Sequence, residues 1–388
     1  MINKTNKPSI AILFNSFWVY KQGASGGDEM AVQVFGRIRK EFNKIYWYTN
    51  LDGSLFARKT VKEVEFSSTP AWMDKMPIFI SCCLRTLSGF INLKKINVDI
   101  LYSSSDFFPD VIPAWLYCRL KPKTKWVQCI FHIYPDWKTR PGNKFISWAV
   151  SNLQKVSIKL SKKSDIIICI NQEVRKYLID QEFDKNRIFV IPPGVDLEYI
   201  DNINPFVNNK YGCYDAIFLG RLCYSKGIMD IPKIWKLVSN EVPNARLGII
   251  GGASESVSNY LSSEFDSLGI FDQVDLCGFV DTDQKYNLLK NSRVLLFPSH
   301  EEGFGIAIVE ALGCELPVVA WNLTVYEELF EDSLTLIEEN DIKTFANKVI
   351  YYINNTVSLG KIRSNRLIAE KYSWLSSSNK MKQLLCNL

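Results

Sequence analysis

Two carboxylates in the segment 299–314 are the first candidates for functional residues. Glu302 stands before a Gly-Phe-Gly turn that follows an apolar strand. Gly305 is expected to begin a helix, and the first amides of a helix have no partner inside it. This helix start would therefore present N–H groups to an anion.

Glu310 is the only charged residue from Ile306 to Cys314, and its neighbours one helical turn away are small or apolar. A helix that is apolar all round is buried, so this carboxylate requires hydrogen-bond donors. The diol of a ribose would supply two donors. The alternative is an ion pair with a basic residue nearby.

Two cations follow the strand expected at 216–219. Arg221 comes directly after Gly220, and Lys226-Gly227 follows five residues later. A guanidinium fork and an ammonium at the mouth of a sheet suit a diphosphate. Two surface cations are more often merely solvated, but the carboxyl end of a strand favours a binding role.

Gly26-Gly27 precedes a helix expected to start near Asp28. Glycines let a backbone approach a ligand closely, and the helix start would present free N–H groups to an anion. The alternative is an ordinary strand-to-helix turn. The segment lacks the G-x-G-x-x-G pattern, which argues against an NAD(P) oxidoreductase.

The chain has two histidines. His132 follows the strand expected at 125–131 and would face a ligand cleft, although a structural hydrogen bond or surface exposure is the usual role of a lone histidine. His300 is expected at most to line the pocket. Asp281-Thr282-Asp283 matches the metal-binding D-x-D pattern but is better explained as the N-cap of a helix.

Short apolar, β-branched runs must position these residues. Those of the first half are 9–15, 44–49, 98–103, 125–131, 165–170 and 188–191; those of the second are 216–219, 246–250, 274–277, 294–298, 317–320 and 334–337. Strands of this kind separated by helices indicate parallel sheets covered on both faces. The fold class is therefore α/β, with two doubly wound Rossmann-like domains whose sheets face a central cleft. The boundary is expected after Pro192-Pro193-Gly194.

Composition fits a globular protein of two domains: 388 residues, 47% hydrophobic and 22% charged. No run reaches the length of a membrane-spanning helix, and the N-terminus does not resemble a signal peptide. The ten irregularly spaced cysteines are expected to be reduced packing residues. With no C-x-x-C pair and two histidines, a zinc site is not expected. These features predict a cytoplasmic protein.

The chain resembles the family 4 retaining glycosyltransferases of GT-B fold through a set of residues that occur in the family's order along almost its whole length. They are Gly26-Gly27, His132, Gly220-Arg221, Lys226-Gly227, Gly278-Phe279-Val280 and the pair Glu302 and Glu310, which have seven residues between them. The resemblance implies four domain segments. Residues 1–196 form an acceptor-side domain, 197–212 a linker, 213–371 a nucleotide-sugar donor domain, and 372–388 a helix that crosses back to the first domain.

The resemblance also implies a donor site without a metal or cofactor. Arg221 and Lys226 would hold the diphosphate and stabilise the leaving nucleotide. Glu310 would bind the ribose, and the backbone around Val280 would read the base. Two cations and a helix N-terminus can offset a diphosphate leaving group, as electrostatic preorganisation requires.

The transferred sugar would be held by the residues around the reacting carbon. Glu302, with the amides of Phe304, Gly305 and Ile306, would contact the sugar and the phosphate, and His132 would contact the sugar. Gly26-Gly27 would approach the diphosphate from the other domain. Two departures stand out: Pro193 replaces the usual asparagine of the linker motif, and no acidic residue directly follows His132.

Charge points to the acceptor side. Residues 1–200 carry 29 Lys+Arg against 18 Asp+Glu, and between Arg119 and Lys163 eleven cations accompany one acid. Residues 143–163 are expected to form a basic amphipathic helix, and 72–93 an apolar one; both could lie on an anionic membrane or pack in the core. Nucleic acid is not an expected partner.

The sequence therefore predicts transfer of a hexose from a UDP- or GDP-sugar to a glycan or lipid-linked acceptor, as in cell-surface polysaccharide synthesis. The place would be the cytoplasm or the inner face of the cytoplasmic membrane. The alternatives are a GT-B-fold sugar-nucleotide epimerase and a non-catalytic nucleotide-sugar-binding module. Base, sugar, linkage and oligomeric state are not specified by these residues.

Overall fold

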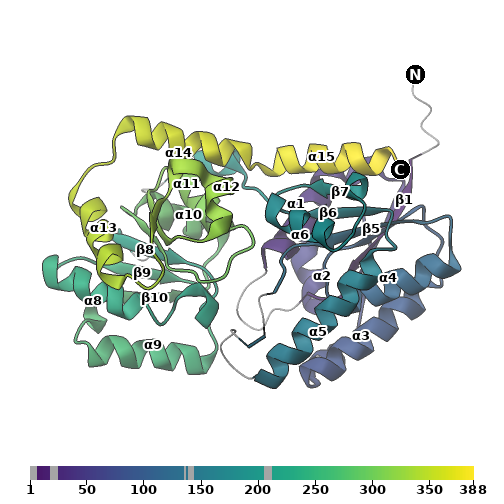
Figure 1. Ribbon diagram of the computed structural model, residues 1–388, viewed down its shortest axis with the longest axis horizontal. Helices are drawn as coiled ribbons and strands as arrows, with labels where there is room; N and C mark the ends of the chain where they lie inside the picture. Colours follow the sequence, from purple (N-terminus) through teal and green to yellow (C-terminus); the bar gives the residue numbers. More distant parts are fainter. Residues whose placement is uncertain (1–6, 18–24, 135–136, 139–143, 205–211) are drawn as a thin grey trace. The chain divides into compact units, whose positions relative to one another are not determined.

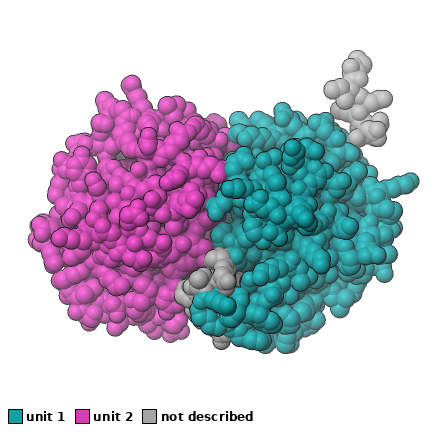
Figure 2. Space-filling view, viewed as in Figure 1, with its two compact units in different colours: residues 1–19, 24–193, 374–388 teal, residues 20–23, 194–373 magenta. Residues whose placement is uncertain are grey.

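The computed structural model describes residues 7–17, 25–134, 137–138, 144–204 and 212–388. The chain forms two compact units, coloured separately in Figure 2. Of the described residues, those up to Pro193 and from Trp374 onward belong to unit 1, and those from Gly194 to Ser373 belong to unit 2. The chain thus enters unit 2 after Pro193 and leaves it after Ser373.

Unit 1 is built on a seven-stranded sheet in the order β3-β2-β1-β4-β5-β6-β7, in which all the pairings are parallel. The six predicted runs are confirmed as strands. One strand, β3, was not predicted because it lies at the sheet edge and buries none of its residues. The strands are β1 Ser9–Phe14, β2 Lys44–Thr49, β3 Glu65–Ser68, β4 Ile100–Ser103, β5 Lys125–Ile130, β6 Ile166–Cys169 and β7 Ile188–Val190.

Helices cover both faces of this sheet (Figure 1). They are α1 Gly26–Ile38, α2 Leu51–Ala57, α3 Ile78–Leu93, α4 Phe108–Leu120, α5 Lys144–Ser161 and α6 Gln172–Asp180, with 3₁₀ turns η1 Arg39–Glu41, η2 Ala71–Lys75 and η3 Lys185–Arg187. The C-terminal helix α15 Trp374–Cys386 completes the unit by packing on α1. Ser377 Oγ donates to the Pro192 carbonyl at 2.6 Å, and Lys382 pairs with Glu41 at 2.7 Å.

Unit 2 has a six-stranded parallel sheet in the order β10-β9-β8-β11-β12-β13. All six predicted runs are confirmed. The strands are β8 Ala216–Leu219, β9 Leu247–Ile250, β10 Val274–Gly278, β11 Leu295–Phe297, β12 Val318–Trp321 and β13 Thr335–Ile337. Fully buried Trp235, Trp321 and Phe345 anchor the core between this sheet and its helices.

The helices of unit 2 begin earlier than expected. Residues 197–202, expected in a linker, form α7 Leu197–Asn202, because Asp196 caps its first turn and Ile200 packs near Gly313. Residues 205–211 of the expected linker lie outside the described residues. The other helices are α8 Ile231–Glu241, α9 Glu255–Ser267, α10 Thr282–Lys290, α11 Ile306–Gly313, α12 Thr324–Phe330, α13 Ile342–Asn354 and α14 Leu359–Lys371, with 3₁₀ turns η4 Tyr224–Lys226, η5 Phe271–Gln273 and η6 Glu331–Ser333.

Over the part of the chain that the structure describes, no helix is both long and apolar enough to cross a bilayer. The same residues contain ten cysteines without a disulfide; Cys83, Cys213 and Cys386 are exposed, so the expectation that all ten are packing residues is wrong for these three.

Candidate functional site

The order of the unit 2 strands reverses between β8 and β11. From β8 the chain moves to β9 and β10 on one side, and β11, β12 and β13 lie on the other. A crevice at the carboxyl ends of the strands is expected at such a reversal, and ligands of doubly wound sheets bind there. Arg221 and Lys226 follow β8, and Glu302 follows β11, so the predicted residues meet at this switch point.

Hydrogen bonds join the loop after β8 to the loop after β11 at the switch point. The His300 amide and the Ser299 hydroxyl both donate to the Ser225 carbonyl, at 2.9 and 3.0 Å. Gly227 closes η4 with a φ of 74°, and a Cβ there would lie 1.9 Å from the Pro298 carbonyl oxygen. Glycine is therefore required for the turn that carries Lys226 to lie against the end of β11.

Lys226 and Glu302 form an ion pair with 2.5 Å between Nζ and Oε1. The Lys226 ammonium also donates to the Glu301 carbonyl at 3.3 Å. The two side chains are only 15% and 8% exposed. An ammonium has three donors, so this arrangement leaves Lys226 one further N–H for a ligand while Glu302 fixes its position. The sequence predicted both residues for the site but not this pairing.

Two further groups of the site could bind an anion: the Arg221 side chain and the backbone N–H groups at the start of α11. Arg221 is exposed, and it has no ion-pair partner among the described residues. Gly305 is the N-cap of α11 with a φ of 89°, as the predicted helix start requires. Within the described ranges, no group accepts from the N–H groups of Phe304, Gly305 and Ile306. Backbone donors of this kind can bind a phosphate.

Glu310 is buried on α11, and two residues of α10 reach it. Lys285 Nζ lies 2.5 Å from Glu310 Oε1, and the Tyr286 hydroxyl donates to the same oxygen at 3.1 Å. The ion pair that the sequence left as an alternative is therefore present. Oε2 accepts no hydrogen bond from the described residues, so one carboxylate oxygen remains for a ribose hydroxyl. Neither Lys285 nor Tyr286 was predicted.

The end of β10 carries the residues expected to contact the base. Val280 is buried, Phe279 beside it is 74% exposed, and Gly278 adopts a φ of 67° that turns the chain. Asp281 accepts from the Gln284 amide at 2.8 Å and caps α10. The helix-cap interpretation of Asp281-Thr282-Asp283 is thus confirmed.

In unit 1, Gly26-Gly27 forms the first turn of α1. Ser25 and Asp28 make a capping box, so the helix begins two residues before the predicted Asp28. A Cβ on Gly27 would lie 2.7 Å from the Phe131 ring. Close packing on Phe131 therefore explains why residue 27 is a glycine, which agrees with the interpretation of this segment as an ordinary strand-to-helix turn.

His132 follows β5 and is held by a network that the sequence did not reveal. Gln154 of α5 donates to the His132 carbonyl and to Asp106, each at 2.7 Å, and accepts from the Tyr134 amide at 3.1 Å. Burial raises the pKa of Asp106, and the Gln154 hydrogen bond opposes that shift. Asp110 is also buried, and burial raises its pKa to about 7. A polar network thus underlies the carboxyl edge of the unit 1 sheet.

His300 uses both ring nitrogens within unit 2. Nε2 lies 2.8 Å from Asp230, and Nδ1 contacts Glu339. Its ring nitrogens are thus bound to protein carboxylates, and the expectation that the ring lines the pocket stays a prediction.

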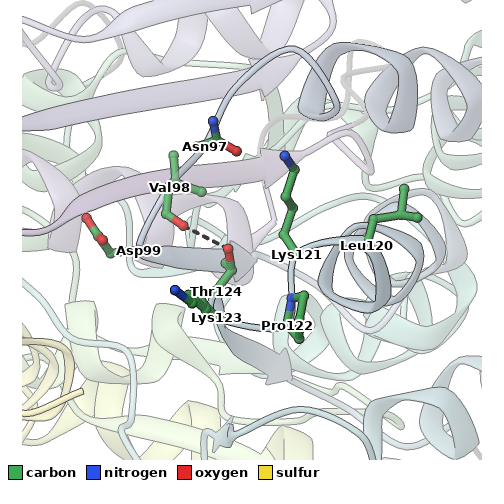
Figure 3. Close-up of a pocket in the computed structure, with 8 residues that line it drawn as sticks. All are labelled: Asn97, Val98, Asp99, Leu120, Lys121, Pro122, Lys123 and Thr124. Carbon is green, nitrogen blue, oxygen red and sulfur yellow. Dashed lines mark hydrogen bonds between the residues drawn. The ribbon is translucent and has the colours of Figure 1, made fainter.

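A pocket of about 430 Å³ lies in unit 1 at the opposite edge of the sheet (Figure 3). It is formed by residues 97–99 before β4 and 120–124 before β5, with Thr124 Oγ1 donating to the Val98 carbonyl at 2.8 Å. Because ligands of such sheets bind at the carboxyl ends of the strands, this pocket is not the candidate site.

Two family comparisons together match most of the chain. Residues 32–199 match the family described as Glycosyltransferase Family 4, and residues 201–374 match Glycosyl transferases group 1. The matches meet where the chain passes from unit 1 to unit 2.

Similar proteins point the same way. The Staphylococcus aureus capsular polysaccharide biosynthesis glycosyltransferase CapM is 25% identical over 201 residues, 49% of this chain and 52% of CapM, so the chain spans about half of that relative. An Escherichia coli UDP-Gal:alpha-D-GlcNAc-diphosphoundecaprenol alpha-1,3-galactosyltransferase is 26% identical over 285 residues, 68% of this chain and 69% of the relative.

Among solved structures, the Anabaena HepE complex with UDP-glucose has a TM-score of 0.75 at 15% identity, covering 98% of this chain and 100% of HepE. That likeness confirms the GT-B fold. With relatives in polysaccharide biosynthesis and family matches along both units, the predicted transferase is favoured over the epimerase and the non-catalytic module. The chain belongs to the family 4 glycosyltransferases and is a glycosyltransferase of GT-B fold.

Proposed function

We propose that this enzyme transfers a hexose from a UDP- or GDP-sugar with retention at the anomeric carbon and without a metal ion. The observation that carries the proposal is the meeting of Lys226, Arg221 and the α11 N-terminus at the β8–β11 switch point. These groups would bind the donor diphosphate. HepE has been solved with UDP-glucose, which supports a uridine donor.

In this proposal the bond between the anomeric carbon and the diphosphate oxygen breaks while the acceptor hydroxyl attacks from the same face. The hydroxyl proton passes to the departing phosphate oxygen. Negative charge grows on that oxygen, and Arg221, Lys226 and the free amides of Phe304 to Ile306 would stabilise it. Because Glu302 already balances Lys226, the exposed Arg221 would supply the uncompensated positive charge.

The nucleoside would be held by Glu310 and the end of β10. Glu310 Oε2 would accept from the ribose, while Lys285 and Tyr286 hold Oε1 in place. The backbone at Val280 would contact the base. From unit 1, His132 would contact the sugar and Gly26-Gly27 would approach the diphosphate.

A donor panel tests this proposal. The enzyme would be incubated with UDP-glucose, UDP-galactose, UDP-GlcNAc or GDP-mannose, with and without an undecaprenyl-diphosphate-linked sugar and with EDTA throughout. We expect transfer that requires the acceptor, persists in EDTA and keeps the donor's anomeric configuration by NMR. Donor conversion without an acceptor would instead indicate an epimerase, and an inverted product would contradict retention.

We also propose that the acceptor is lipid-linked and is met at an anionic cytosolic membrane surface. The support comes from α3 and α5, whose apolar sides face outward. On α5 the buried positions include Ser147, Ser151 and Ser157, while Phe145 is 72% exposed and Trp148 stacks on it. A soluble helix normally shows the reverse arrangement.

Helix α3 has the same reversal. Its buried residues are Ser81, Cys82, Arg85, Gly89 and Leu93, and its exposed large side chains are Ile78, Phe79, Ile80, Leu87 and Ile91. Helix α4 packs against both α3 and α5, and the three lie together on one side of the unit 1 sheet (Figure 1). Packing in the domain core accounts for Leu93 of α3 and Ile158 of α5 but not for the exposed apolar residues of the two helices.

This outward surface combines apolar anchors with cations. Residues 119–163 carry eleven Lys+Arg against one acid, and three of these cations, Lys144, Lys155 and Lys159, are exposed on α5 itself, where they suit anionic lipids. Helices α3 and α5 each lead into a strand of a parallel sheet, so both begin at the carboxyl edge, where His132 lies. Such a surface would hold the enzyme near a lipid-linked acceptor, the acceptor class in the name of the E. coli relative.

Vesicle flotation tests the membrane proposal. We expect binding to phosphatidylglycerol-containing vesicles at low salt. The double variant Phe145→Ser/Trp148→Ser should bind about tenfold or more weakly, because it lacks two aromatic side chains that would insert into the membrane. Tyr351→Ser, which removes an exposed aromatic of unit 2, is the matched control and should float normally. If the wild type stays unbound at low salt, the membrane proposal is wrong.

A further inference from the structure

The His300 ring links three segments of unit 2. Its Nε2 lies 2.8 Å from Asp230 Oδ2, directly before α8, and its Nδ1 contacts Glu339, which follows β13. Trp321 at the end of β12 donates to the same Asp230 oxygen at 3.3 Å. The ring therefore anchors the loop after β11 to elements on either side of it.

That loop carries the groups that position Lys226. The His300 amide donates to the Ser225 carbonyl, and the next two residues supply the Glu301 carbonyl and the Glu302 carboxylate that bind the Lys226 ammonium. A displacement of His300 would thus move both partners of Lys226.

The protonation state of the ring decides whether both bridges can exist. An imidazolium donates from both nitrogens, whereas a neutral imidazole donates from one and presents a lone pair from the other. The titratable groups that face the ring are Asp230 and Glu339, both carboxylates. Loss of the ring proton would therefore leave one carboxylate facing a lone pair.

We infer that His300 is a positioning residue for the donor site, whose imidazolium holds Glu302 and Lys226 in their binding arrangement. The inference rests on the proposed function, since it concerns the same diphosphate site. Hydrogen bonding to Asp230 raises the pKa of His300 above its ordinary value of 6.5, with Glu339 adding to the rise against the opposing effect of burial. Donor affinity should consequently fall as pH rises through that raised pKa.

Calorimetric titration of UDP and GDP from pH 7 to 9 tests this inference, because the terminal phosphate is already ionised there. We expect wild-type affinity to fall with pH. His300→Gln should bind about tenfold more weakly at pH 7, through loss of charge-assisted hydrogen bonds, and should show no further fall. Glu339→Gln should move the fall to lower pH because one carboxylate no longer favours the imidazolium.

Glu338→Gln is the matched control, since its carboxylate faces Asn322 and not the ring. It should retain the wild-type pH profile. A flat wild-type profile, or an unchanged midpoint in Glu339→Gln, would overturn the inference while leaving the proposed function intact. If neither nucleotide binds the wild type at any pH, the proposed function itself fails.

Discussion

Replacing Lys226 by methionine separates its structural role from its catalytic one. The substitution keeps most of the side-chain volume but removes the ammonium 2.5 Å from Glu302. Removing one partner of a buried ion pair destabilises a protein by ~3–5 kcal/mol, because the other charge stays buried and unpaired. Lys226 retains 15% exposure, so the lower end, about 3 kcal/mol, is expected.

The double variant Lys226→Met/Glu302→Gln removes both charges. Neutral replacement of a buried pair is often without net effect, so the free energy of unfolding should return to within about 1 kcal/mol of the wild type. Turnover should not return. Loss of one preorganised group that stabilises the leaving charge lowers kcat by ~10²–10³-fold, equivalent to about 2.7–4 kcal/mol.

Urea unfolding measures the first effect, and chromatographic detection of the released nucleotide measures the second. Arg246→Met is the matched control. Arg246, directly before β9, pairs with Asp275 of β10 at the opposite end of the strands, so its loss should leave kcat unchanged. The reasoning is refuted if the double variant recovers wild-type turnover, because Lys226 would then serve merely to neutralise Glu302.

Three further predictions concern other parts of the structure. Gly227→Ala should lower the free energy of unfolding, measured in urea, by more than ~2 kcal/mol. The left-handed backbone disfavours alanine, and its Cβ would also clash with the Pro298 carbonyl; wild-type stability would contradict this. Glu310→Gln should weaken nucleotide binding about tenfold in calorimetry and also lower the free energy of unfolding, because Lys285 loses its buried partner; unchanged affinity would remove Glu310 from the site. Burial raises the pKa of Asp110 from 3.8 to about 7, so the stability that its protonated form contributes is complete below pH 3.8 and is lost as pH rises through 7. Asp110→Asn should flatten that decline in urea unfolding measured from pH 4 to 7, and a parallel decline in both proteins would contradict it.

The strands were predictable because buried parallel strands are short, continuous apolar runs. The missed strand β3 has no such run, since its residues are exposed or half-buried at an edge. The meeting of Arg221, Lys226 and Glu302 at one end of the sheet was predictable because each follows a strand. Their order along the chain also fits the family pattern.

The partners of those residues could not be read from the sequence. Lys285 reaches Glu310 from a different helix, and Gln154 joins Asp106 to the backbone of His132 across three elements. No periodicity relates such positions. The outward apolar face of α5 was also hidden, because the helical pattern predicts two faces but not which one packs.

Calorimetric titration of UDP and GDP into the wild type and Lys226→Met, with Arg246→Met as control, tests the β8–β11 site most directly. The account predicts that one of the two nucleotides binds the wild type and the control equally, with one site per chain, and binds Lys226→Met at least about tenfold more weakly. Equal affinity in all three proteins, or no binding of either nucleotide to the wild type, would contradict a diphosphate site at this switch point.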